Sequence, residues 1–337
     1  MIQAKHLGID IGGANIKVAL PNGHAISRPL QLWRYPERLV TELATVRSFF
    51  GKVGTLAVTM TGELCDCYPT KREGVAAITE AVTQAFPNSK IMYWSTEGRF
   101  IDPEQATQDY LRVASSNWHA LATAVARHLP ERYGMLIDIG STTTDLIPIQ
   151  DRKVLNVGLT DPERLRSGSL LYTGVRRTPI CAVLQHAICA ELFATTQDAY
   201  VLLGHLVAQP ESTMTADGRP LTVQHAHTRL ARMLGGDGEM IDHQETATLA
   251  ARVRAVQMEM LLAAIDHIES QLDSHHAQAF VMTGSGEFLI RAALEERRIR
   301  RPDKPFRDIS MEHQLGPHTS ASACAHAVAS LASYFYP

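Results

Sequence analysis

Two short segments of the chain each place an aspartate just before a turn of glycine and small polar residues. Residues 7–17 read LGIDIGGANIK, and residues 136–147 read LIDIGSTTTDLI. Glycine lets backbone N–H groups approach an anion closely, hydroxyl groups add hydrogen-bond donors, and an aspartate can hold a divalent cation beside them. The repeat therefore predicts two phosphate-binding turns that together clamp a polyphosphate.

An apolar run precedes the aspartate in both segments, which indicates a buried strand that ends at the acid. A dinucleotide-binding turn would need the spacing G-x-G-x-x-G, which neither Gly8, Gly12 and Gly13 nor the single Gly140 provides. A P-loop is excluded as well, because no G-x-x-x-x-G-K-[ST] occurs in the chain. What remains is a unit of strand, acid and turn that is used twice.

The composition limits the class of protein. A chain of 337 residues with 45% apolar and 20% charged residues is large enough for two domains. Its apolar runs are too short to span a bilayer and its N-terminus lacks a signal-peptide order, so we expect a cytoplasmic protein without membrane association. A net charge of −3 argues against a nucleic-acid surface. Five unevenly spaced cysteines indicate free thiols.

Hydrophobic periodicity predicts the elements that hold the turns. We expect a β-hairpin at residues 7–20, a short strand at residues 55–60, and an irregular stretch and a connector at residues 160–179 and 302–317. Helices are expected at residues 37–50, 74–86, 117–128, 244–272 and 319–331. The last of these is rich in small residues, which allow close packing against another element.

The ordered pair of turns resembles the two phosphate motifs of the actin, sugar kinase and Hsp70 superfamily. Residues 10–17 have the form DxGxxxxK, residues 138–145 the form DxGxTxxD, and VMTGSGEFLI at residues 281–290 resembles the adenosine segment. The resemblance implies an α/β, two-domain actin-like ATPase (ribonuclease H-like) fold with an inter-domain cleft. The first domain would comprise residues 1–130 and 318–337, and the second residues 131–317.

Within this superfamily, DIGSTTTDLIPI resembles the hydantoinase and oxoprolinase branch. Longer segments, including TMTGELCDCYPTKREGV at residues 59–75 and YTGVRRTPICAV at residues 172–183, resemble the tetrahydromethanopterin-linked one-carbon transfer pathway family, which includes furan-methanamine synthases of methanofuran biosynthesis. That likeness implies a transferase that condenses an aminomethylfuran methyl diphosphate with γ-glutamyltyramine to an aryl ether and releases pyrophosphate. The expected partners are these two small molecules; a homo-oligomer is left open.

The resemblance also assigns roles to individual residues. It implies Mg²⁺ as the cofactor, held by Asp10, Asp138 and Asp145. It implies phosphate contacts from Gly12, Gly13, Lys17, Gly140, Ser141, Thr142, Gly284 and Gly286. Lys17 is also expected to act in catalysis by neutralising the departing diphosphate. A phenol has a pKa of about 10, so ether formation needs a base or a strongly electrophilic carbon, and Asp145 or Glu63 is the candidate base.

Two other classes of function fit the same turns. An ATP-dependent small-molecule kinase or an oxoprolinase-like amide hydrolase would bind ATP, whereas a non-catalytic nucleotide-binding regulator would use the fold as a scaffold. Acids in both turns favour chemistry, because a scaffold needs no metal-held leaving group. Four cationic residues outside the turns are further candidates for substrate contact, and the sequence does not choose among Lys71, Arg72, Arg176 and Arg177.

Overall fold

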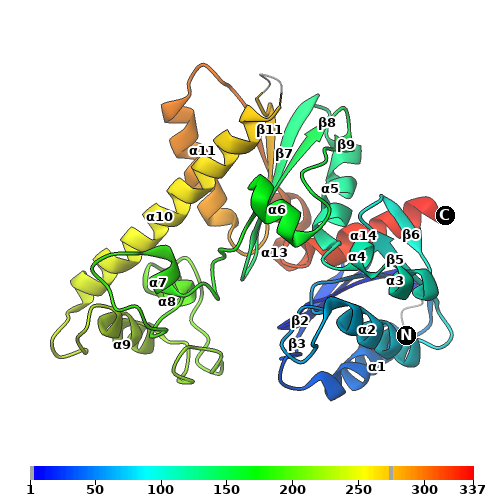
Figure 1. Ribbon diagram of the computed structural model, residues 1–337, viewed down its shortest axis with the longest axis horizontal. Coiled ribbons are helices and arrows are strands. Elements are labelled where there is room, and N and C mark those ends of the chain that lie inside the picture. Colours follow the sequence, from blue (N-terminus) through cyan, green and yellow to red (C-terminus); the bar gives the residue numbers. More distant parts are fainter. Residues whose placement is uncertain (1–3, 273–275) are drawn as a thin grey trace. The chain divides into compact units, whose positions relative to one another are not determined.

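The computed structural model describes residues 4–272 and 276–337 and divides into two compact units (Figure 1). The first unit comprises Met1–Leu136, Ile147–Ser167 and Ser310–Pro337, and the second Ile137–Leu146 and Gly168–Ile309. The division expected from the sequence instead assigned residues 131–136, 147–167 and 310–317 to the second domain. Residues 147–167 make contacts within the first unit because strand β9 (Lys153–Val154) lies against helix α5 (Asn117–His128).

The first unit is built on a six-stranded mixed sheet. Its strand order is β3 (Ala25–Pro29), β2 (Asn15–Ala19), β1 (Ala4–Ile11), β4 (Val53–Met60), β5 (Lys90–Ser95) and β6 (Arg99–Ile101). Strands β1, β4 and β5 are parallel, and the others pair antiparallel. Parallel strands are covered on both faces, which explains the almost unbroken apolar runs in β1 and β4.

Helices α1 (Leu39–Phe50), α2 (Lys71–Ala85) and α5 lie close to the positions that the periodicity predicted, the helix expected at residues 319–331 is α14 (Ala323–Phe335), and the shorter helices of the unit were not predicted. Helix α1 follows the short η1 (Pro36–Arg38). Thr70 is the N-cap of α2, and its side chain accepts a hydrogen bond from the N–H of Glu73. The remaining helices of the unit are α3 (Pro103–Gln108), α4 (Tyr110–Val113), α5, α6 (Asp161–Ser167), α12 (Met311–Leu315), α13 (Pro317–Ser320) and α14 (Ala323–Phe335).

Helix α14 packs against β1 and α5, which confirms the expected close packing of the small-residue helix. A Cβ added at Gly8 of β1 would clash with the carbonyl oxygen of Ala325 and come within 2.9 Å of the Ala329 Cβ. Glycine on the strand and alanines on the helix therefore let the two backbones approach closely. The contact joins the first strand of the chain to its last helix.

A second mixed sheet carries the second turn. Its strand order is β10 (Leu170–Leu171), β8 (Thr144–Gln150), β7 (Tyr133–Ile139), β11 (Ala279–Thr283) and β12 (Arg307–Ser310), with β9 paired to β8. The division between the units runs through β7 and β8. Two expectations are wrong in detail: residues 160–179 contain α6 and β10, and the connector at residues 302–317 contains β12 and α12.

The second unit also contains a cluster of helices, α7 (Ile180–Val183), α8 (Thr196–Leu202), α9 (Val223–Met233) and the long α10 (His243–Ser270), followed after β11 by α11 (Glu287–Arg300). Figure 1 shows α10 running from this cluster towards β11. A buried ion pair joins α8 to α9, because Arg229 donates to Asp198 at 2.7 Å and both side chains are 0% exposed.

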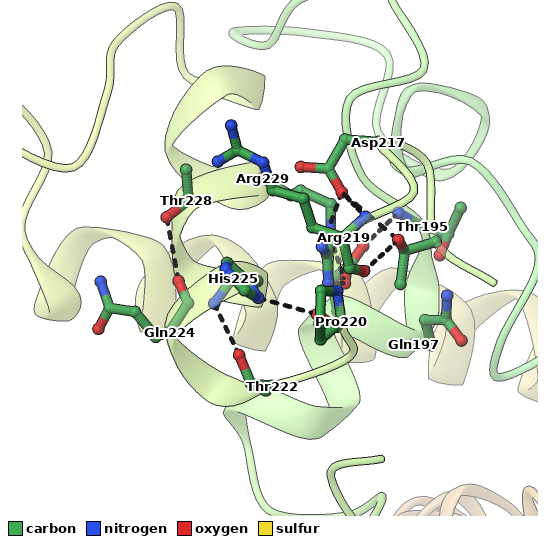
Figure 2. Close-up of polar contacts among 12 residues, drawn as sticks. Thr195, Gln197, Asp217, Arg219, Pro220, Thr222, Gln224, His225, Thr228 and Arg229 are labelled. Atoms are coloured by element: carbon green, nitrogen blue, oxygen red, sulfur yellow. Dashed lines mark hydrogen bonds and ion pairs between the residues drawn. The ribbon is translucent and has the colours of Figure 1, made fainter. Parts of the chain in front are cut away.

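Figure 2 shows the segment that leads into α9, where Arg229 also donates to Asp217 at 2.9 Å. The hydroxyl of Thr222 caps the helix by accepting from the N–H of His225 at 3.2 Å. A buried guanidinium that loses either acid would be left partly uncompensated, so these contacts fix how the helices of the cluster pack. No helix of the part of the chain that the structure describes is long and apolar enough to cross a membrane.

Candidate functional site

The first turn follows β1 and closes on itself. The N–H of Gly12 donates to the carbonyl of Asn15 at 2.9 Å, while the carbonyls of Gly13 and Ala14 accept from the segment after β3, at 2.9 Å from Leu32 and 3.0 Å from Leu30. Over residues 4–272 and 276–337, the N–H groups of Gly13 and Ala14 donate no hydrogen bond. With its carbonyls satisfied by the protein, the turn offers two adjacent N–H groups to an anion.

The second turn repeats this arrangement after β7. The N–H of Gly140 donates to the carbonyl of Thr143 at 2.9 Å, and the carbonyl of Ser141 accepts from the N–H groups of Arg176 and Arg177 at 3.1 and 2.9 Å. Within the described residues, the N–H groups of Ser141 and Thr142 donate no hydrogen bond. The two turns therefore expose the same pair of backbone donors at equivalent positions.

The hydrogen bonds within the turns determine which backbone N–H groups remain available as donors. The N–H groups of Gly12 and Gly140 are used to close the turns, so these glycines shape the turns and do not donate to an anion. Ala14 instead provides a donor that sequence reasoning missed, because its side chain carries no chemistry. The available signal was its position one residue after Gly13, which matches Thr142 after Ser141.

Asp10 ends the apolar part of β1 and is buried, with 5% of its surface exposed. The hydroxyl of Thr59 on β4 donates to its Oδ1 at 3.1 Å, and the strand register places Lys17 opposite on β2. Burial raises the pKa of the Asp10 carboxyl above its ordinary value, although Lys17 and Thr59 act in the opposite direction. Lys17 thus lies beside Asp10 near the first turn.

The second aspartate of the repeat, Asp138, lies at the end of β7 and is partly exposed. A Cβ added at Gly284 would clash with its Oδ1, and Gly284 has a φ of +89°, so only glycine is suited to this position. The N–H of Gly286 donates to the carbonyl of Ile139 at 2.9 Å, and its Cα packs against the Ile139 side chain. These two glycines therefore hold the start of α11 against the second turn.

The two candidate bases lie in different surroundings. Asp145 lies on β8 opposite Leu170 and keeps 9% of its surface exposed. Glu63 is 0% exposed and lies in the loop after β4, which is tied to the first turn because Gly62 donates to the carbonyl of Ile11 at 3.0 Å. The hydroxyl oxygen of Ser115, a residue with a φ of +50°, lies 3.0 Å from Glu63 Oε1.

Glu63 belongs to a small buried polar cluster of the first unit. The hydroxyl of Ser115 also lies 2.9 Å from Asp161 Oδ2, and Lys71 Nζ lies 2.8 Å from that oxygen and 3.5 Å from Glu63 Oε1. Since one hydroxyl carries one proton, Ser115 can donate to only one of the two carboxyl groups. Burial raises the pKa of Glu63, against the lowering by Lys71. If Glu63 is protonated and donates to Ser115 from Oε1, the Ser115 hydroxyl is free to donate to Asp161.

The acids at the turns suit Mg²⁺ better than a cation that needs a complete protein cage. Within the described residues no group of three or more His, Cys, Asp or Glu side chains is arranged to hold a metal ion. Mg²⁺ usually takes one or two carboxylates and completes its shell with water and substrate phosphates. Each turn follows a strand that carries one such acid, Asp10 on β1 and Asp138 on β7, so each turn can offer one carboxylate of the kind that Mg²⁺ uses.

The chain is similar to curated proteins along almost its whole length. It is 33% identical over 338 residues to the (4-{4-[2-(gamma-L-glutamylamino)ethyl]phenoxymethyl}furan-2-yl)methanamine synthase of Methanocaldococcus jannaschii, with 96% of each chain covered. It is 28% identical over 205 residues to the enzyme of the same name from Methanococcus vannielii, covering 58% of this chain and 89% of that one. Residues 54–178 match the hydantoinase/oxoprolinase family.

Among solved structures, the chain is similar to a ROK family glucokinase from Streptomyces griseus, crystallised with glucose and AMPPNP. The TM-score is 0.52 at 16% identity, and the match covers 98% of this chain and 99% of the glucokinase. At this identity the likeness concerns the fold alone. The fold class expected from the two turns, two mixed sheets with helices as in the actin-like ATPases, is confirmed.

Proposed function

Because this chain belongs to the family of (4-{4-[2-(gamma-L-glutamylamino)ethyl]phenoxymethyl}furan-2-yl)methanamine synthases of methanofuran biosynthesis, we propose that it joins an aminomethylfuran methyl diphosphate to γ-glutamyltyramine. The phenoxymethyl group in the family's name is an ether between a phenol oxygen and the methylene carbon on a furan ring. Forming it makes one O–C bond, breaks the C–O bond to the diphosphate, and releases pyrophosphate and the phenol proton.

The observation that supports a diphosphate leaving group is the repeated pair of backbone N–H groups that, in the described residues, have no acceptor and lie close in sequence to an aspartate. Negative charge grows on the diphosphate as its C–O bond breaks, and preorganised donors stabilise that charge. Gly13 and Ala14 in the first turn, and Ser141 and Thr142 in the second, offer such donors without moving. Lys17, beside the first turn, adds a positive charge.

Mg²⁺ fits the same chemistry, and the acids that the turns would offer to it are Asp10 in the first turn and Asp138 in the second. When bound, the ion would neutralise charge on the diphosphate oxygens as a Lewis acid. The acids have a second effect on binding, because without a cation each would repel the anionic substrate. We therefore propose that diphosphate and Mg²⁺ bind together, not independently.

The phenol proton needs an acceptor, and we propose Asp145 for that role. Both acids are buried, but Asp145 keeps 9% of its surface exposed, whereas Glu63 keeps 0% and lies against Ser115 and Lys71. A carboxylate acceptor must come within hydrogen-bond reach of the phenol, which favours the more accessible group. Glu63 then serves to hold the loop after β4 against the first turn.

The decisive experiment supplies the purified protein with the furan diphosphate, γ-glutamyltyramine and Mg²⁺, and follows pyrophosphate and the ether product by mass spectrometry. The proposal expects both in equal amounts, and no pyrophosphate when either substrate is omitted. A parallel reaction replaces the diphosphate with ATP. Release of ADP or phosphate there, with no ether product in the first reaction, would support the kinase or amide hydrolase alternative instead.

A further inference from the structure

The four cationic residues that the sequence could not rank have different surroundings in the structure. Lys71 is paired with Asp161 at 2.8 Å, and the guanidinium of Arg72 stacks over the ring of Tyr110 at 4.2 Å. Both cations already have partners in the first unit. The other two, Arg176 and Arg177, are neighbours in the second unit, on the segment that follows β10.

Arg176 differs from its neighbour Arg177 in burial. Arg177 is exposed to solvent, whereas Arg176 is half-buried. Throughout residues 4–272 and 276–337, the guanidinium of Arg176 has no carboxylate partner and makes no hydrogen bond. Burial lowers the pKa of Arg176 below its ordinary value, and no nearby acid offsets this. A partly desolvated cation without a counter-charge is costly, which is a feature of anion-binding sites.

The backbone of Arg176 is attached directly to the second turn. Its N–H donates to the carbonyl of Ser141 at 3.1 Å, and the preceding residue, Val175, donates to the carbonyl of Gly140 at 3.1 Å. These contacts use the carbonyls of the turn and leave the N–H groups of Ser141 and Thr142 available. The unpaired guanidinium and the two available donors therefore belong to one rigid piece of backbone.

A network of buried side chains fixes the segment that carries Arg176. Thr144 donates to the carbonyl of Thr173 at 2.7 Å, Thr196 donates to the carbonyl of Gly174 at 2.9 Å, and Gln257 donates to the Thr173 hydroxyl at 2.7 Å. A Cβ at Gly174 would lie 2.5 Å from the backbone nitrogen of Thr142. Such support keeps a binding residue in place before its ligand arrives.

We propose that Arg176 is a diphosphate-binding residue of the second turn, and that its guanidinium contacts phosphate oxygens held by the N–H groups of Ser141 and Thr142. The planar fork of arginine matches a phosphate bidentately, which a lysine cannot do. The identity of the anion as a diphosphate rests on the proposed function. The role of Arg176 in binding an anion rests on its own burial and position.

Calorimetry with pyrophosphate and Mg²⁺ tests the inference without requiring turnover. Arg176→Gln should raise the Kd for pyrophosphate by about 10- to 100-fold, because a hydrogen-bonded charge contact contributes on the order of 1.5–3 kcal/mol. Arg176→Lys should give an intermediate Kd, because it keeps the charge and loses the fork. Arg177→Gln removes the same charge one residue away and should change the Kd by less than about twofold.

Two further measurements separate binding from folding. The thermal midpoint of Arg176→Gln should match that of the wild type within the scatter of the method, because the Arg176 guanidinium makes no hydrogen bond or ion pair within the described residues. Guanidinium ion at millimolar concentration should restore part of the pyrophosphate affinity of Arg176→Ala and leave Arg177→Ala unchanged.

The outcomes distinguish this inference from the proposed function. Equal pyrophosphate affinity in Arg176→Gln and Arg177→Gln would overturn the role of Arg176 even if the synthase reaction proceeds. Weaker pyrophosphate binding by Arg176→Gln alone, in a protein that makes no ether product, would support Arg176 and refute the synthase proposal. A wild-type protein that does not bind pyrophosphate would refute both.

Discussion

The protonation of the acids at the two turns depends on the residues that surround them. Asp10 is buried under Thr59 and opposite Lys17, whereas Asp138 is partly exposed next to Gly284. The sequence presents them as equivalent, yet burial raises the pKa of Asp10 and so favours its neutral form. A bound cation would reverse that preference, which couples the charge of Asp10 to occupancy of the first turn.

The first prediction at this scale concerns the cation. Asp10→Asn and Asp138→Asn should each weaken pyrophosphate binding in Mg²⁺ by about tenfold or more, because one charged ligand to the metal is lost. In EDTA, all three proteins should bind pyrophosphate weakly, and neither variant should bind it more weakly than wild type, because Asn removes a charge that repels the anion. Titration calorimetry measures both conditions, with the exposed Asp303→Asn as the matched control. Wild-type affinity that is insensitive to EDTA would rule out the role of the metal.

A second prediction concerns Glu63 and pH. Its pKa is raised in the folded protein, so the folded state binds the proton more tightly than the unfolded state does. The associated stability is present below the unfolded pKa of 4.5 and is lost as pH rises through the raised folded value. Glu63→Gln mimics the neutral form and should therefore not lose this stability. At neutral pH its unfolding free energy should exceed that of wild type by about 1.4 kcal/mol for each unit by which folding raises the pKa of Glu63.

Urea unfolding of Glu63→Gln and wild type from pH 4 to pH 8 measures the difference directly. The two proteins should have similar unfolding free energies at the acid end, and the variant should be the more stable at neutral pH. A variant less stable than wild type at neutral pH would instead mean that Glu63 is ionised and paired with Lys71. A double-mutant cycle of Glu63→Gln with Lys71→Met then distinguishes the cases, since Lys71 also pairs with Asp161 and only an ionised Glu63 gives a stabilising coupling energy with Lys71.

At the scale of elements, each turn is shaped by a segment that is distant in sequence. The first turn is bound by the segment after β3, and the second by the segment after β10. In both cases, N–H groups of the distant segment donate to the carbonyls of the turn. Two N–H groups of each turn have no acceptor within the described residues. Under the proposed function, anion binding would therefore depend on contacts that neither turn makes alone.

Gly174→Ala tests that dependence. The added Cβ would lie 2.5 Å from the Thr142 nitrogen and 2.6 Å from the Ser141 carbonyl carbon, so the turn and the segment must move apart. We expect a loss of stability of about 1–3 kcal/mol together with weaker pyrophosphate binding. Gly204→Ala is the control, because it adds strain at a φ of +75° with open space around it. Gly204→Ala should lose stability and keep its pyrophosphate affinity.

On the scale of the molecule, the first unit is assembled from three separate stretches of chain. Its sheet includes the N-terminal strands, residues 147–167 add β9 and α6, and the last helix, α14, covers β1. The first unit therefore cannot be completed before the C-terminal residues have been synthesised. Burial of β1 under α14 links the strand that ends in Asp10 to the far end of the chain.

Gly8→Ala measures the strength of that link. A Cβ at this position clashes with the Ala325 carbonyl, so α14 must shift away from β1. We expect the unfolding free energy to fall by about 3 kcal/mol, at the upper end of the cost of overpacking a core. Limited proteolysis should then cleave α14 in the variant before the wild type. Unchanged stability and cleavage would show that α14 does not pack as closely as described.

Some features of this protein were readable from local sequence. Apolar runs that end in Asp10 and Asp138 predicted strand ends, and the residues after them predicted turns, because burial patterns and turn chemistry act over a few neighbouring residues. The resemblance of the two turns, in this order, to the phosphate motifs of a known superfamily indicated the fold. Helix α5 was predicted with its observed bounds, and α10 within two residues at either end, for the same reason.

Tertiary contacts decided which of those residues present groups to a ligand. The backbone N–H groups of Gly12 and Gly140 donate the hydrogen bonds that close the turns, and Glu63 is buried in a polar cluster. Arg176 is left unpaired while Lys71 acquires a partner 90 residues away. Hydrogen-bond partners and desolvation depend on segments brought together by folding, and no local pattern records them.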